Sequence, residues 1–92
     1  MRTVYKYPIE AFYLELMLPE EANIVYVGLD SHSVPCIWVE LNPNDAQTKQ
    51  KIMVFGTGYS IDDPNLEHIG SFVQDVFVWH VYIHRNPYNP LI

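Results

Sequence analysis

The chain has 92 residues, with five Lys and Arg against 11 Asp and Glu and a formal charge of −6. Hydrophobic residues make up 49% of it and charged residues 17%, so the composition excludes a disordered acidic tail and predicts one small folded domain. We expect that domain over residues 1–85, followed by an extended C-terminal arm over residues 86–92, where two prolines oppose sheet pairing.

Several protein classes are disfavoured by simple features of the chain. The first apolar run contains Pro8, Glu10 and Glu15, so neither a signal peptide nor a membrane span is expected. The five basic residues are scattered, which argues against direct nucleic-acid binding. A single cysteine, Cys36, cannot form an intrachain disulfide and favours a reducing compartment. We therefore expect a cytoplasmic protein.

The first half of the chain contains segments with the two-residue alternation of strands. Residues 3–7 and 12–18 are the first two, although apolar residues around Phe12 also fit a helical turn. Residues 23–30 follow, with Val25, Val27 and Leu29 expected on one face. Residues 36–41 complete a hairpin whose loop has about five residues.

The second half adds a short strand over residues 51–55 and a strong one over residues 77–84. We expect the face with Phe77, Trp79, Val81 and Ile83 to lie in the core. Residues 68–74 are its expected hairpin partner, with Gly70 at a bulge or a close backbone approach. A helical turn behind Asp63 is the alternative there.

Six or seven short, closely spaced strands predict a mainly β fold. We expect a single compact antiparallel sheet, curled into a small barrel or sandwich. A β-rich α+β fold is the alternative, because two segments also carry helical spacing.

Five pieces of sequence resemble a family of small, uncharacterised proteins from bacteriophages and prophages. They are TVYKYP, LPEEANIVYVG, FGTGYSI, HIGSF and FVWHVY. The KYP, GTG and FVWHV motifs are part of this resemblance, which covers about residues 3–83. It implies a compact domain of unknown function from a viral genome, located in the host cytoplasm, with no assigned activity, cofactor or catalytic residue. The terminal HRNPYNPLI departs from the family pattern.

Catalytic and metal sites find little support in the spacing of chemical groups. His80 and His84 would lie about 13 Å apart on a strand, too far to share one ion. Cys36 begins an apolar strand, which favours a small core side chain over a nucleophile. Residues 31–33, Ser-His-Ser, are more simply a hairpin loop. We therefore expect that the protein is not an enzyme and that it binds neither a cofactor nor a metal.

The aromatic surplus is the strongest functional signal, because 13 rings exceed what so small a core can hide. The candidate protein-binding residues are Tyr82, the flanking His80 and His84, and Tyr88 on the arm, since tyrosine is common in binding hot spots. The leading hypothesis is a non-catalytic phage-type accessory protein that binds a host or viral protein through an aromatic sheet face. Counter-defence inhibition is inferred from the viral resemblance alone.

Two alternatives remain open at this stage. The first is a protein that sequesters an anionic nucleotide, with Gly56, Thr57, Gly58 and Tyr59 as the ligand-binding turn; a structural turn competes with this interpretation. The second is a structural or assembly protein that forms a homo-oligomer, its arm adding to a neighbour's sheet edge.

Overall fold

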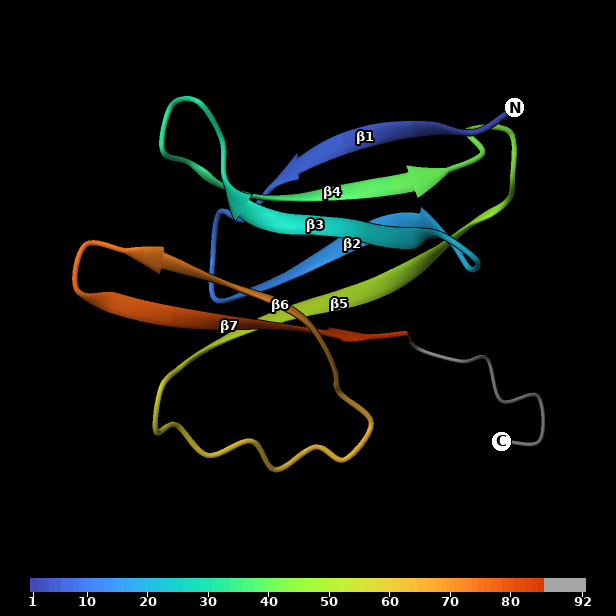
Figure 1. Cartoon of the computed structure of the whole chain (residues 1–92). Coiled ribbons are helices and arrows are strands. Elements are labelled where there is room, and N and C mark those ends of the chain that lie inside the picture. The colour runs from blue at the N-terminus through green and yellow to red at the C-terminus, as the bar shows by residue number, and fades with distance from the viewer. Residues whose placement is uncertain (86–92) are drawn as a thin grey trace.

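The computed structural model describes residues 1–85, which form seven strands and no helix. Three strands, in the order β1-β4-β3, make one sheet, and four, in the order β2-β5-β7-β6, make the other. All pairs are antiparallel, and the two sheets form layers of a sandwich rather than a closed barrel (Figure 1). The strands are β1 (Thr3–Pro8), β2 (Tyr13–Pro19), β3 (Asn23–Leu29), β4 (Pro35–Leu41), β5 (Gln47–Gly56), β6 (Glu67–Gln74) and β7 (Phe77–His84).

The prediction of a mainly β fold is confirmed. The strands form two sheets, however, and not the single sheet that we expected. The β3–β4 hairpin has the predicted five-residue loop, and the segment behind Asp63 enters a strand rather than a helix. Strand β5 begins earlier than expected, at Gln47, because its polar first half pairs with β2. There Gln50 is buried, and its side-chain amide donates to the carbonyl oxygen of Pro19 at 3.0 Å. The described part of the chain contains no helix that could cross a membrane.

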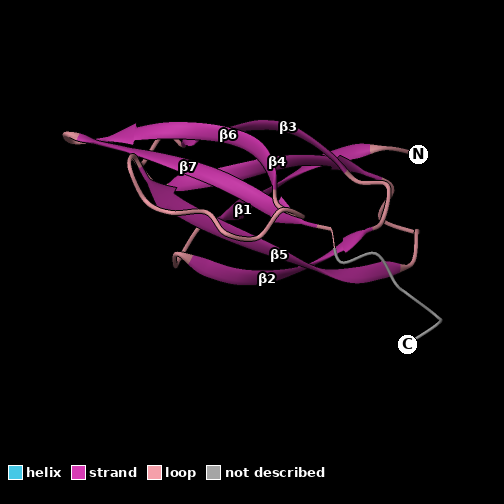
Figure 2. Ribbon diagram, turned by 90° about the horizontal axis from the view of Figure 1, so that it is seen from below, coloured by secondary structure: helices cyan, strands magenta, loops and turns pink. Residues whose placement is uncertain are grey.

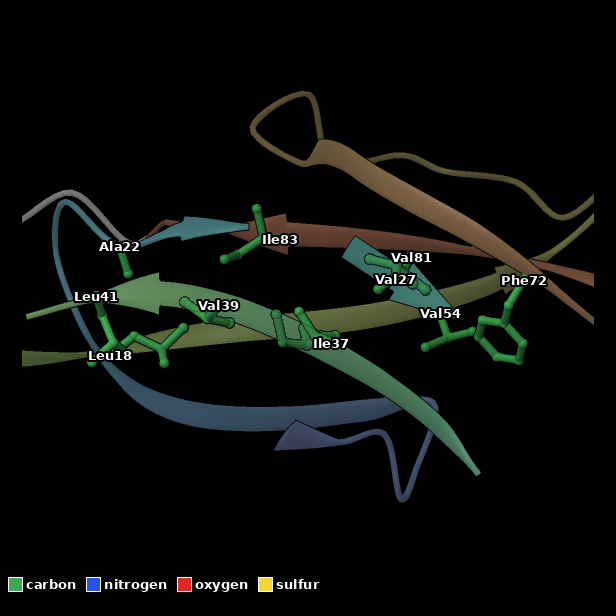
Figure 3. Packing of buried hydrophobic residues seen from close by; sticks show 11 residues of the cluster. Leu18, Ala22, Val27, Ile37, Val39, Leu41, Val54, Phe72, Val81 and Ile83 are labelled. Carbon is green, nitrogen blue, oxygen red and sulfur yellow. The ribbon is translucent and has the colours of Figure 1, made fainter. Parts of the chain in front are cut away.

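The core lies between the two sheets, on the faces that alternation predicts. Side chains of β4, β5 and β7 supply most of it (Figure 3). Ile37, Ile52 and Ile83 are fully buried, as are Val39 and Val81. Both sheets contribute to one continuous cluster, so neither sheet has a core of its own.

A bulge in β3 changes the predicted face of two residues. The pairing with β4 shifts between Ile24 and Tyr26, so that Val25 is the extra residue. Ile24 therefore packs against the core together with Val27, whereas Val25 is 48% exposed. The prediction that Val25 shares the face of Val27 was wrong, because one inserted residue reverses the alternation before it.

Strands β3 and β6 bring the two sheets together along one side. Gly70 lies at a register shift in β6, as predicted, and a Cβ added there would stand 2.6 Å from the Cβ of Val27. Only a residue without a side chain allows this approach. The contact closes one flank of the sandwich, whereas β1 and β2 are the terminal strands on the other.

The β6–β7 hairpin projects beyond the other strands at one end of the molecule (Figure 2). Its inner face is covered by the smaller sheet only in part. Val81 and Ile83 are fully buried, Trp79 is half-buried and Phe77 is 58% exposed. The prediction of a core face was therefore right for the second half of β7 and wrong for Phe77, because the opposite sheet ends before it.

Candidate functional site

Four rings gather where the β6–β7 hairpin projects. Phe12, Phe77 and Tyr59 surround Trp79, with ring centroids 5.2, 5.8 and 6.3 Å from it. The three outer rings are between 58% and 64% exposed, whereas Trp79 is half-buried. We call Phe12, Tyr59, Phe77 and Trp79 the aromatic end.

Three separate segments position these rings. Phe12 lies in the crossover from β1 to β2, whose backbone is held by hydrogen bonds from Ile9 N–H to the Pro35 carbonyl at 2.8 Å and from Val54 N–H to the Phe12 carbonyl at 2.9 Å. Tyr59 closes a turn in which its N–H donates to the Gly56 carbonyl at 3.1 Å. Phe77 and Trp79 lie in β7 and pair with β6. Ordered backbone therefore holds the four rings in place without deep burial.

Two open hollows flank Trp79. The first, of about 200 Å³, lies between the crossover and the hairpin. Its lining is Ile9, Glu10, Ala11, Phe12, Pro35, Val54, Phe72, Gln74 and Trp79. The second, of about 400 Å³, is bordered by Gly56, Thr57, Tyr59, Val76, Phe77, Val78 and Trp79. These are shallow, mostly apolar surfaces with few polar groups.

The charges at the aromatic end are all negative. Glu10 lines the first hollow, and Asp75 occupies the hairpin turn between β6 and β7. Within residues 1–85, no Lys or Arg lines either hollow. Four of the five basic residues form ion pairs elsewhere: Arg2 with Glu40, Lys6 with Asp30, Lys49 with Glu15 and Arg85 with Glu67.

Tyr82, His80 and His84 lie together on the outer face of the larger sheet, away from the aromatic end. All three are half-buried. The Tyr82 ring packs edge-on against the rings of His68 and Phe55, with centroids at 5.2 and 5.6 Å. The fourth predicted binding residue, Tyr88, lies outside the described residues. The neighbouring side chains of the sheet therefore cover part of the Tyr82 ring.

The loop over residues 57–66 runs across this outer face (Figure 2), and His80 connects it to the sheet. His80 Nε2 lies 2.9 Å from Thr57 Oγ1, and Nδ1 lies 2.8 Å from Ser71 Oγ. His68 Nε2 lies 3.0 Å from the same Ser71 oxygen. Farther along, His84 Nε2 is 4.0 Å from an Asp63 carboxylate oxygen. These contacts give the predicted histidines structural partners.

The turn over residues 56–59 is a structural turn with Gly58 in the left-handed region, at φ 91°. Its hydroxyl group on Thr57 is already within hydrogen-bond distance of His80. The side chains beside it are aromatic and aliphatic. An anionic ligand would therefore meet no cationic side chain among the residues that border this hollow.

Cys36 and the loop before it have structural surroundings. Cys36 is buried, and burial, followed by the nearby Asp30 carboxylate, raises the pKa of its thiol. Asp30 itself accepts hydrogen bonds from the backbone N–H groups of His32 and Val34, at 2.8 and 2.9 Å. The Val34 bond and the Lys6 ammonium group lower the pKa of the Asp30 carboxyl to about 2. A raised pKa leaves Cys36 a poor nucleophile.

Comparison with known proteins identifies the family. Residues 1–90 match the domain of unknown function DUF7352. The chain belongs to the DUF7352 family. The match extends beyond residue 83, so the DUF7352 domain includes most of the terminal segment that the sequence resemblance left out. Neither a curated protein nor a solved structure matches the chain.

Sequence reasoning missed Phe12 and Phe77 as surface rings of this DUF7352 domain, and it missed Glu10 beside them. Alternation indicates on which side of a strand a ring lies, but it does not indicate where the opposite sheet ends. The available signal was the density of rings around the predicted hairpin at residues 68–84. The part of the chain that the structure describes contains no cluster of three or more His, Cys, Asp or Glu residues suited to a metal.

Proposed function

We propose that this DUF7352 domain is a non-catalytic binding protein that docks on another protein through the aromatic end. The observation that supports this proposal is the exposure of Phe12, Tyr59 and Phe77, each more than half accessible around a half-buried Trp79. Aromatic side chains offer a large contact area at low conformational cost and are enriched in binding hot spots.

The proposed docking surface differs from the Tyr82 surface that the sequence favoured. The Tyr82 face is covered in part by ring packing and by the loop over residues 57–66. At the aromatic end, three ring surfaces face solvent, and two hollows lie beside them. Removing such apolar area from water is a main source of association free energy. Tyr82, His80, His84 and Tyr88 are the secondary candidates.

The biological setting that we propose is that of a bacteriophage or prophage protein. A phage or prophage origin, a host or viral protein as the partner and inhibition of host defence all come from the sequence resemblance. The family match gives a domain of unknown function and adds nothing to these points. We keep the viral setting because it names the lysate in which a partner is best sought.

A matched pair of variants tests the docking surface. Phe77 is 58% exposed and packs beside Trp79, whereas Tyr26 is 59% exposed and packs beside Trp38 on the other sheet. We expect immobilised wild-type protein and Tyr26→Ser to capture the same protein from phage-infected host lysate. Phe77→Ser should weaken that capture at least about tenfold, since hot-spot truncations cost 2 kcal/mol or more.

Circular dichroism would verify that both variants are folded. If Phe77→Ser captures the partner as well as the wild type does, the aromatic end is not the docking surface. A loss of capture with Tyr82→Ala alone would instead assign the contact to the outer face of the larger sheet.

A further inference from the structure

We propose that the aromatic end selects an arginine-bearing segment of its protein partner, with the guanidinium group against Phe12 and Trp79 and with Glu10 as its counter-ion. This inference rests on the proposed function and adds the chemistry of the occupant. It depends on the juxtaposition of rings and carboxylates with a surface that lacks positive charge.

The rings of the aromatic end lie close to one another. The ring centroids of Phe12 and Trp79 lie 5.2 Å apart with an interplanar angle of 40°, and Phe77 lies 5.8 Å from Trp79 at 35°. Phe12 and Phe77 are each more than half exposed, so part of this ring surface is accessible to a ligand. A cation is attracted to the face of a tryptophan, and arginine also stacks on it as a flat group.

Two carboxylates give the aromatic end a negative charge. Glu10 lines the hollow between Phe12 and Trp79, and Asp75 lies at the tip of the hairpin that carries Phe77. Within residues 1–85, neither carboxylate forms an ion pair. A carboxylate accepts two parallel hydrogen bonds from a guanidinium group. The site thus supplies both a π surface and an acceptor for one arginine side chain.

Other surfaces of the protein are less suited to an arginine side chain. The net charge of −6 attracts any cation. Glu15 also lies beside an exposed ring, that of Tyr13, but this carboxylate is already paired with Lys49 at 3.7 Å.

The exposed Tyr26 packs beside the half-buried Trp38 on the other sheet. However, the residue opposite Trp38 is the cationic Lys6, and the nearby Asp30 carboxylate is already paired with Lys6. The aromatic end is therefore the more favourable surface for an arginine side chain.

The test uses the full chain and a capped hexapeptide of alternating glycine and arginine, followed by NMR. We expect the peptide to shift the indole N–H signal of Trp79 and the backbone signals of Glu10 and Phe12, and to leave the indole signal of Trp38 in place. A glycine–glutamine hexapeptide should shift none of them. A glycine–proline hexapeptide that shifts Trp79 equally would overturn the assignment to arginine.

Two charge variants separate a specific site from general attraction. Glu10→Gln and Glu21→Gln remove the same charge, but Glu21 lies past the opposite end of β2. We expect Glu10→Gln to weaken peptide binding about 3- to 10-fold and Glu21→Gln less than about twofold. Equal weakening by both would show that only net charge acts and would refute the site.

The outcome is distinguishable from that of the proposed function. Capture of a protein that depends on Phe77, together with no binding of the arginine peptide, would remove the arginine preference and retain the docking surface. Binding of the arginine peptide that responds to Glu10→Gln but not to Phe77→Ser would support the site formed by Glu10, Phe12 and Trp79 and would separate it from the Phe77-dependent docking of the partner.

Discussion

Asp30 holds the β3–β4 loop with both carboxylate oxygens. One oxygen accepts from the N–H groups of His32 and Val34, and the other lies 3.0 Å from Lys6 Nζ. Ser33 adopts φ 62° within this loop, which is uncommon for a residue with a side chain. The sequence indicated a hairpin loop here, and the carboxylate explains why the loop takes one conformation.

Asp30 should make the stability of the protein depend on pH. Its pKa falls from 3.8 to about 2 in the folded state, so the charged form is favoured by folding. The contribution is complete above about pH 4 and is lost as the pH falls through about 2. In urea unfolding between pH 7 and pH 2, Asp30→Asn should have a lower midpoint than the wild type at neutral pH, and the two midpoints should converge in acid.

The matched control for this experiment is Asp45→Asn, in another exposed loop. Its midpoint should follow that of the wild type over the whole pH range. If Asp30→Asn also runs parallel to the wild type down to pH 2, the hydrogen-bonded carboxylate is not what stabilises the loop.

At the scale of elements, the contact between β3 and β6 limits how close the sheets can come. The Cβ that Gly70→Ala introduces would stand 2.6 Å from the Val27 Cβ and 2.8 Å from its Cγ2. Since the nearest atom is bonded to the backbone, a rotamer change cannot remove the overlap. We expect Gly70→Ala to lower the free energy of unfolding by about 1–3 kcal/mol, as overpacked cores do.

Gly56→Ala is the comparison, because its new Cβ would meet the Tyr59 ring at 3.0 Å. That ring is 60% exposed and can move, so the change in stability should stay below about 1 kcal/mol. Val27→Ala retains the Cβ that an alanine at position 70 would overlap, so it should not restore the stability that Gly70→Ala loses. Full rescue in the double variant, measured by urea unfolding, would disprove the backbone-level contact.

The sequence was sufficient to predict the individual strands, because each carries its own alternation, as in residues 36–41 and 77–84. It was insufficient where a feature depends on another strand. The bulge at Val25 is visible only in the register against β4. The contacts of His80 with Thr57 and Ser71 join a loop and two strands through long-range pairing. The exposure of Phe77 depends on where the opposite sheet stops, and no local pattern records that.

At the scale of the whole molecule, both sheets share one core, so they should unfold together. Trp38 lies in the smaller sheet and Trp79 in the larger one. In Trp79→Phe and Trp38→Phe variants, the remaining tryptophan reports on one sheet, and the two fluorescence midpoints in urea should respond identically to further substitution. Adding Ile37→Ala, a fully buried side chain, should destabilise both by about 2–5 kcal/mol.

Leu14→Ala is a milder control, because Leu14 is only partly buried against the core. Its effect should be smaller and again equal for both reporters. If Ile37→Ala shifts the Trp38 transition and leaves the Trp79 transition in place, the sheets are independent folding units and the shared core does not couple them.

The crossover over residues 9–12 passes from one sheet to the other and presents Phe12 beside Trp79 of β7. A molecule that binds both rings would contact the crossover that joins the two sheets and also strand β7 of the larger sheet. Occupancy would then protect the entire fold against heat, by about 2.7 kcal/mol at a concentration 100 times the Kd. A rise in Tm on adding a fraction of lysate proteins would therefore reveal a bound partner before its identity is known.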